Sequence, residues 1–369
     1  MKNKVWRYIV LLTLACPFLL NAAAQGVSTW IETTHDFGTF KEEVKTVTCT
    51  MKMVNTGDSA MVITRVQSTC GCTVAEFTHE VIQPGDTGCV DITYSARNIP
   101  GQFEKKVFVY TSGRPRRTVL TVKGNVIGSP ETVNDRYPVA VGPVRLNVGS
   151  LPLGEMYRGK PQNAYLSGYN TSSDTMLVTV EDVPGNISAH VLPDTVAPGG
   201  LFIISVYYDS AMAKEWGLNI DTLSVYATPL RKSSTAAMGA ARINVMAHVK
   251  EDFSKWTDKQ KRNAPVVEIS TDKLDFEEVN PQEAVKRSFS VKNAGKSSLA
   301  IRRLFVPQGE GLTVTCDKEE ISKGGEATVT VTFDGRSRGD RLLNSRLVVM
   351  TNDPYTPQVI VRLVGVLKK

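Results

Sequence analysis

Hydrophobic and polar residues alternate one by one through many short segments of this chain. In residues 90–94 the apolar side chains occupy every second position, and residues 329–333 repeat that arrangement. Such alternation is typical of a β-strand that buries one face. Segments of this kind recur every 8–12 residues or so, separated by Gly, Pro, Asn and Asp, which is the spacing of a sandwich or barrel. Long helical periodicity is absent, so the pattern predicts an all-β protein.

Two sequence elements occur three times along the chain. The first is a glycine-containing turn followed by a strand, found at 82–94, 196–208 and 321–333. The second is the end of a strand at an asparagine, found at Asn55, Asn170 and Asn293. We interpret these asparagines, and the glycines that follow two of them, as turn residues because Asn and Gly tolerate positive φ. The repeat length, about 105 residues, is the size of one sandwich domain rather than a solenoid repeat.

These repeats predict three tandem immunoglobulin-like β-sandwich domains. A chain of 369 residues suits two or three domains of ordinary size. The predicted domains cover residues 27–127, 138–250 and 265–369, joined by linkers at 128–137 and 251–264. A single helical turn is expected in the second linker.

The N-terminus predicts a cleavable signal peptide over residues 1–24. Three cations within the first seven residues precede an apolar run at 9–20, and small residues follow at 22–24. A lipoprotein anchored at Cys16 is disfavoured, because Thr13 stands where a large aliphatic residue is preferred. We therefore expect a periplasmic or cell-surface protein, whose mature chain begins near Gln25.

The mature chain offers no general case for a nucleic-acid or membrane partner. Loss of the three N-terminal cations lowers the formal net charge from +6 to +3, a small surplus for binding a polyanion. No segment after residue 24 approaches the ~20 apolar residues of a membrane span, so no integral membrane segment is expected. Three arginines around Pro115 predict a charged hairpin tip, and a similar cluster surrounds Arg338. Solvated loops are the main interpretation of both, and an anionic envelope partner is the alternative.

A series of short motifs resembles a bacterial family of hydin-like (ASH-type) immunoglobulin domains, DUF1573, frequent in envelope proteins of Gram-negative anaerobes. In order they are His35–Asp36–Phe37–Gly38, Asn55–Thr56–Gly57, Cys70–Gly71–Cys72–Thr73, Pro84–Gly85 and Lys123–Gly124. The resemblance covers roughly residues 30–127. The third domain follows it more weakly and lacks the Cys-Gly-Cys, and the second departs furthest. The resemblance implies a sandwich of about seven or eight strands in an envelope protein, and it implies no activity.

Five cysteines remain after export, and an odd number leaves at least one unpaired within the chain. Cys49 is expected to point into the core, close enough to Cys70 or Cys72 for a disulfide. That bridge would close a loop of about 20 residues and stabilise the domain by about 3 kcal/mol. Cys89 is out of phase with its apolar neighbours and is the candidate free thiol. Cys316 is expected to be packed rather than reactive.

Two other interpretations of the Cys-Gly-Cys motif stay open. Cys70 and Cys72 are candidate ligands of a soft metal such as Cu(I) or Zn, with His35 or His79 as a further ligand. Zinc sites more often have a two-residue gap and a second ligand pair, which are missing here. The motif could also form a redox-active dithiol. No thioredoxin-like pattern surrounds it.

Five Asp-Ser or Asp-Thr pairs followed by an aliphatic residue or Met are candidate O-glycosylation sites. They resemble the acceptor motif of a general glycosylation system in some envelope-rich bacteria, and they fall at Ser59, Thr175, Thr195, Ser210 and Thr222. The other interpretation is that such pairs are ordinary turns and strand starts.

We expect no catalysis and no cofactor. The four histidines lie in no hydrolase or metalloprotease motif, and no glycine-rich loop links a strand to a helix. The predicted function is a non-catalytic envelope scaffold or adaptor that contacts envelope proteins or glycans. The alternatives are a metal- or thiol-handling protein that uses Cys70 and Cys72, and a periplasmic assembly chaperone that uses an exposed edge strand.

Overall fold

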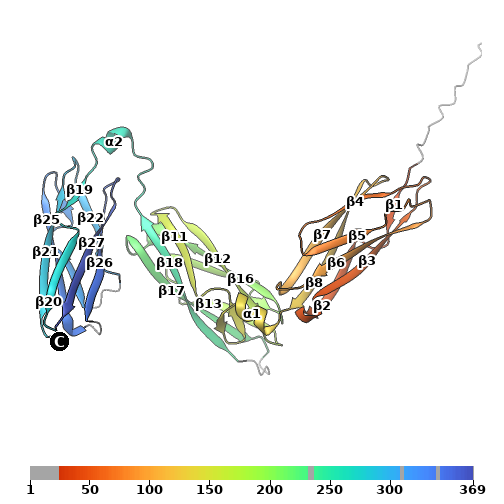
Figure 1. Cartoon of the computed structure of the whole chain (residues 1–369), viewed down its shortest axis with the longest axis horizontal. Helices are drawn as coiled ribbons and strands as arrows, with labels where there is room; N and C mark the ends of the chain where they lie inside the picture. The colour runs from red at the N-terminus through yellow and green to blue at the C-terminus, as the bar shows by residue number, and fades with distance from the viewer. Residues whose placement is uncertain (1–24, 232–236, 308–310, 338–340, 369) are drawn as a thin grey trace, which may run out of the picture. The chain divides into compact units, whose positions relative to one another are not determined.

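A computed structural model describes residues 25–231, 237–307, 311–337 and 341–368. The predicted signal peptide, residues 1–24, lies outside them. The described residues form six β-sheets, which pair into three sandwiches with separate hydrophobic cores (Figure 1). The prediction of tandem immunoglobulin-like β-sandwiches is therefore confirmed. The first compact unit ends at Ser129, and the second, which holds two sandwiches, begins at Pro130. No described helix is long and apolar enough to cross a membrane.

The first sandwich packs sheet β1-β3-β6-β5 against sheet β2-β8-β7-β4. The alternation expected in residues 90–94 is confirmed, because Val90, Ile92 and Tyr94 are fully buried between the sheets. Tyr94 stacks on Phe103 of the opposite sheet with ring centroids 3.7 Å apart. The elements of the first sandwich are β1 (Ser28–Trp30), β2 (Thr34–Lys41), η1 (Glu42–Val44), β3 (Thr46–Asn55), β4 (Ile63–Ser68), β5 (Thr73–Phe77), β6 (Thr87–Ser95), β7 (Gly101–Thr111) and β8 (Arg117–Ile127).

The second sandwich has two five-stranded sheets, β14-β16-β12-β10-β9 and β11-β18-β17-β13-β15. It begins with a helix, α1, which occupies the predicted first linker. Its elements are α1 (Pro130–Arg136), β9 (Val139–Val141), β10 (Val144–Leu146), β11 (Ser150–Tyr157), β12 (Gln162–Asn170), β13 (Met176–Glu181), β14 (Ile187–Leu192), β15 (Thr195–Val196), β16 (Leu201–Tyr208), η2 (Ser210–Met212), β17 (Gly217–Pro229) and β18 (Gly239–Lys250).

The third sandwich packs β19-β21-β25-β23 against β20-β27-β26-β22-β24. Before it, the helical turn expected in the second linker is α2, which begins with a capping box between Thr257 and Gln260. The elements are α2 (Asp258–Arg262), β19 (Val267–Ile269), β20 (Lys273–Val279), β21 (Ala284–Asn293), β22 (Leu299–Phe305), β23 (Leu312–Cys316), β24 (Glu320–Ile321), β25 (Glu326–Asp334), η3 (Gly335–Ser337), β26 (Leu342–Thr351) and β27 (Gln358–Leu367).

The three repeated asparagines are buried side-chain anchors. Asn55, Asn170 and Asn293 are each 0% exposed. Each donates from Nδ2 to two main-chain carbonyls, for example Ser297 O at 2.8 Å and Ile321 O at 2.9 Å in the third domain. Each Oδ1 accepts a main-chain N–H two residues further along the chain. The asparagine thus ties the end of one strand to the glycine-containing turn before the next.

The interpretation of these asparagines as positive-φ turn residues is wrong. None of them, nor Gly57 or Gly295, is among the described residues with positive φ. The glycines are required for space instead. A Cβ at Gly57 would lie 2.1 Å from Gln25 O, and one at Gly295 would lie 2.4 Å from Ala264 O.

Candidate functional site

The Cys-Gly-Cys motif forms a disulfide within itself. Cys70 and Cys72 are joined across the turn between β4 and β5, with Cα atoms 5.4 Å apart. Both are partly exposed, and Cys72 packs on the cluster around Tyr94 and Phe103. Cys72 N–H points at Cys70 Sγ at 3.2 Å. The bridge therefore closes a three-residue loop at the end of the first sandwich.

The expected bridge from Cys49 to this motif is absent, and that prediction was wrong. Cys49 lies on β3, which pairs with β1 and β6, whereas β4 belongs to the opposite sheet. The sequence argument assumed that β3 and β4 are neighbours in one sheet. The inward orientation of Cys49 is confirmed, since it is 8% exposed. Burial raises the pKa of its thiol to about 11, so the thiol stays protonated at neutral pH.

No metal site forms around the motif. Among the described residues, no three His, Cys, Asp or Glu side chains are arranged to hold a metal ion. Cys70 and Cys72 form a disulfide with each other. Neither therefore has the free thiolate that binds a metal ion. His35 is engaged elsewhere, with Glu32 at 3.6 Å and in an edge-on contact with Phe37 at 4.7 Å. The structure does not bring the predicted ligands together.

Cys89 and Cys316 are unpaired and partly exposed. Cys89 lies on the outer face of β6 opposite Lys52 and forms no disulfide within the described residues. Cys316 packs against the third core, and its Sγ is 3.0 Å from Lys318 O. Burial raises the pKa of the Cys316 thiol.

The five candidate glycosylation residues differ in access. Thr195 is exposed, and Ser59, Thr175 and Thr222 are partly exposed. Ser210 is fully buried, and its hydroxyl donates to Tyr157 O at 2.8 Å. Ser210 is therefore excluded as an acceptor in the folded protein. Its Asp-Ser pair begins the short helix η2, where Asp209 accepts from Ala211 N–H.

Sequence reasoning missed a face of the second domain that lacks acidic and basic side chains and exposes several large hydrophobic ones. Strands β12, β16 and β14 pair directly, so their outward side chains form three rows. The residues in the rows are Asn163, Tyr207 and Ser188, then Tyr165, Ser205 and His190, then Ser167, Ile203 and Leu192. None carries an Asp, Glu, Lys or Arg. Four are large hydrophobic side chains with 40–63% of their surface exposed. We call these nine residues the tyrosine face.

The same sheet in the other two domains has a mainly polar outer face, on which Val74 of the first domain is the one exposed large hydrophobic residue among those described. Tyr207 corresponds to Thr93 and Thr332 in the repeated turn-strand segments, and Ile203 corresponds to Cys89 and Thr328. In the first and third domains, outward side chains instead hydrogen bond across strands, as Ser288 does with Thr330 at 2.9 Å. The sandwich therefore does not require an apolar outer face. A signal was present in the sequence, because residues 201–208 are apolar at outward and inward positions alike.

One end of this sheet is already covered by helix α1. Val133 and Tyr137 pack on Tyr169 and Leu201, which form the row next to the tyrosine face. The rings of Tyr137 and Tyr169 stack with centroids 5.8 Å apart. Arg145 holds the end of the helix by donating to Tyr137 O at 2.6 Å. The adjacent rows have no such cover within the described chain.

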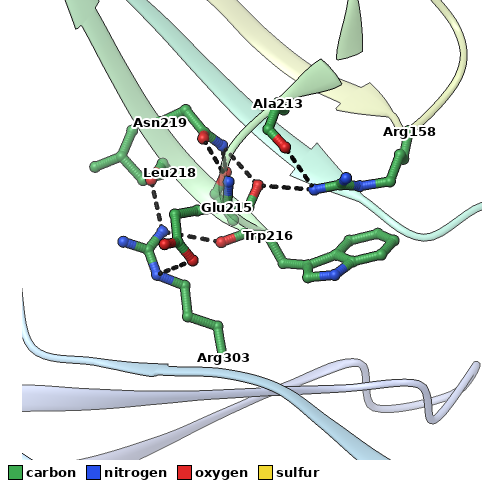
Figure 2. A network of polar contacts seen from close by, with 8 residues as sticks. Arg158, Ala213, Glu215, Trp216, Leu218, Asn219 and Arg303 are labelled. Atoms are coloured by element: carbon green, nitrogen blue, oxygen red, sulfur yellow. Dashed lines mark hydrogen bonds and ion pairs between the residues drawn. The ribbon is translucent and has the colours of Figure 1, made fainter. Parts of the chain in front are cut away.

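The second and third domains are joined by a set of polar contacts around Trp216. Arg303 of β22 donates to Trp216 O at 2.9 Å and Leu218 O at 2.8 Å (Figure 2). From the second domain, Asn219 and Arg158 hold the same segment, and the Arg158 guanidinium lies 4.3 Å over the Trp216 ring. These contacts give the start of β17 a defined conformation against the third domain.

A second set of contacts between the second and third domains lies beside Trp216. Arg302 makes a bidentate ion pair with Glu251 at 3.0 and 3.1 Å. The Gly217 position, which has φ of 77°, would place a Cβ only 2.4 Å from the sulfur of Met350. Glycine is therefore required where the start of β17 packs against Met350 of the third domain.

Comparisons with known proteins find a matching family model and leave the activity open. The model of a family described as a protein of unknown function, DUF1573, matches residues 28–126 and 267–366, just over half of the chain. No curated protein matches. A crystal structure of a protein of unknown function from Porphyromonas gingivalis is 18% identical, covers 61% of this chain and 100% of its own, and has a TM-score of 0.48. An ASH/PapD-like domain of human CEP192 is 11% identical over 30% of this chain and 88% of its own, with a TM-score of 0.26.

Proposed function

This chain belongs to the DUF1573 family of proteins of unknown function, and we propose that it is an exported, non-catalytic adaptor whose second domain binds another envelope protein. The tyrosine face is the observation that carries this proposal. Four of its nine residues are exposed large hydrophobic side chains, and exposed apolar side chains that gather on one face with a polar rim mark interaction sites. Tyr is enriched at protein interfaces and charged residues are depleted from their cores, as on this face.

The polar counterparts of this face support the proposal. The first and third domains keep Thr, Ser, Lys, Asp and Glu at most of the equivalent positions of the same sheet, with Cys89 and Val74 as the exceptions in the first domain. The exposed hydrophobic side chains are therefore a property of the second domain and are not required by the sandwich fold. Helix α1 covers the adjacent row with the aliphatic Val133 and the aromatic Tyr137. A partner segment with similar side chains would suit the tyrosine face.

Site-specific cross-linking in intact cells tests the proposal. A photo-reactive side chain at Ser205, in the centre of the tyrosine face, is expected to capture one envelope protein. The same group at Thr330, the equivalent position of the third domain, is expected to capture none. The recovered chain should begin at Gln25, as expected of an exported protein.

A matched pair of double variants provides the control. Tyr165→Lys with Tyr207→Lys should reduce the captured species at least tenfold, because two buried charges would replace two interface anchors. Ser288→Lys with Thr332→Lys adds the same charge at the equivalent positions and should leave capture unchanged. Capture that is equal at Ser205 and Thr330, or a captured species that is only a second copy of this chain, would refute the adaptor function.

A further inference from the structure

The outer face of the first domain's second sheet carries a cluster of cations beside two aromatic rings. Strand β7 lies between β4 and β8 (Figure 1). One row across the three strands holds Arg65, Tyr110 and Arg117. The next row holds Gln67, Phe108 and Val119, and Lys106 of β7 follows opposite Thr121. We call these eight residues the arginine face.

Both arginines of this face are stacked on aromatic rings. The Arg65 guanidinium lies 4.2 Å over the Tyr110 ring, and the Arg117 guanidinium lies 4.7 Å over the Phe108 ring. Both arginine residues are exposed, so their N–H groups remain available to a ligand. Stacking restricts the side chain, so less conformational entropy is lost when the planar fork binds an anion.

The cations of this face have no acidic partner. No ion pair within 4.0 Å involves Arg65, Lys106 or Arg117 in the described part of the chain. Arg114 and Arg116, exposed at the adjoining hairpin tip, extend the positive region. The first acidic residues, Glu104 and Asp36, lie one row beyond Lys106 on either side of Lys123. Lys123 pairs with Asp36 at 3.6 Å. The first three rows therefore carry uncompensated positive charge.

We propose that the arginine face binds an acidic polysaccharide. Guanidinium forks match carboxylate and sulfate groups with two parallel hydrogen bonds. Arg65 and Arg117 are two strands apart, a separation of about 10 Å at the backbone. A linear polymer with an anionic group on each sugar presents every second charge at a comparable interval. Between the cations, Gln67 and Thr121 provide neutral hydrogen-bonding groups, which suit sugar hydroxyls better than a purely ionic partner.

This inference is independent of the protein-binding role of the tyrosine face, because it concerns another domain and other side chains. If both hold, the first domain retains the chain on an acidic glycan while the second recruits a protein. Either can fail without affecting the other.

Binding of the full mature chain to immobilised heparin and polygalacturonate tests the inference, with neutral dextran as the reference. We expect saturable binding to both acidic polymers and none to dextran. Arg65→Gln with Arg117→Gln should weaken binding at least tenfold. It should also reduce the slope of log Kd against log salt concentration by about two, one for each lost ionic contact.

The matched control removes the same charge from the equivalent sheet of the third domain. Arg346 and Arg362 are exposed and face each other across β26 and β27, and Arg346→Gln with Arg362→Gln should leave binding unchanged. Equal loss in both double variants would mean binding by net charge only and would overturn the site. Stronger binding to anionic lipid vesicles or single-stranded DNA, lost in the same Arg65 and Arg117 variant, would overturn the assignment to a polysaccharide. Thermal unfolding should be unaltered, since both arginines lie outside the core.

Discussion

At the scale of single residues, the buried asparagines show how a polar side chain can define a β-sandwich. Each binds two carbonyls and one N–H at a strand end, and burial makes the loss of such a hydrogen bond costly. The sequence marks these positions clearly by repetition, and we predicted turns there. The wrong part was the mechanism, because a requirement for side-chain hydrogen bonds and a requirement for positive φ both select Asn. Only the surrounding structure distinguishes the two.

We expect Asn293→Ala to destabilise the third domain by about 2–3 kcal/mol, because it removes three hydrogen bonds of a fully buried side chain. Hydrogen exchange followed by mass spectrometry measures this domain separately from the others. Ser288→Ala, which removes an exposed cross-strand hydrogen bond, serves as the control and should change stability by less than about 0.5 kcal/mol. An Asn293→Ala protein with unchanged protection in the third domain would contradict the anchoring role.

At the scale of elements, strands and turns decide which cysteines meet. Cys49 was correctly placed on the inward face of its strand. Its expected partner was wrong because consecutive strands β3 and β4 belong to opposite sheets. Local alternation reports which face a residue occupies, but it carries no information on which strand lies beside which. The same limit hid the tyrosine face, whose nine residues come from three strands.

The size of the closed loop predicts how much the Cys70–Cys72 disulfide contributes to stability. A three-residue loop restricts the unfolded chain little, so Cys70→Ser with Cys72→Ser should cost about 1–2 kcal/mol. The bridge from Cys49 would have contributed about 3 kcal/mol. Thermal unfolding of the oxidised, the reduced and the double-variant protein provides the comparison, and the last two should agree. If the first domain no longer folds after reduction, the Cys70–Cys72 disulfide is essential for its stability and this prediction is wrong.

At the scale of the molecule, the second and third domains are held together by side chains that local pattern does not predict. Arg303 reaches from the third domain to two carbonyls of the second (Figure 2). Arg302 of the third domain pairs with Glu251. Sequence reasoning treated residues 251–264 as a linker and named none of these contacts. Long-range pairs of this kind have no signature in spacing, because their partners are separated by more than fifty residues.

Arg303→Ala should release the segment around Trp216 without unfolding either domain. Two charge-assisted hydrogen bonds to partly buried carbonyls are lost, and we expect backbone amide exchange in residues 213–219 to accelerate about tenfold. Arg287→Ala, which removes an arginine whose contacts stay within the third domain, should leave that segment unchanged. Unaltered exchange in residues 213–219 after Arg303→Ala would mean that Asn219 and Arg158 suffice to hold it.

The sequence by itself determined the strands, the number of domains and the repeated anchors. These features depend on alternation, glycine-containing turns and repetition, all of which act over a few residues. The family resemblance also came from short motifs in order. Tertiary structure alone decided the pairing of the cysteines, the burial of Ser210, the tyrosine and arginine faces, and the contacts around Trp216. Each of these depends on which strands become neighbours, and that choice is made by packing between residues far apart in the chain.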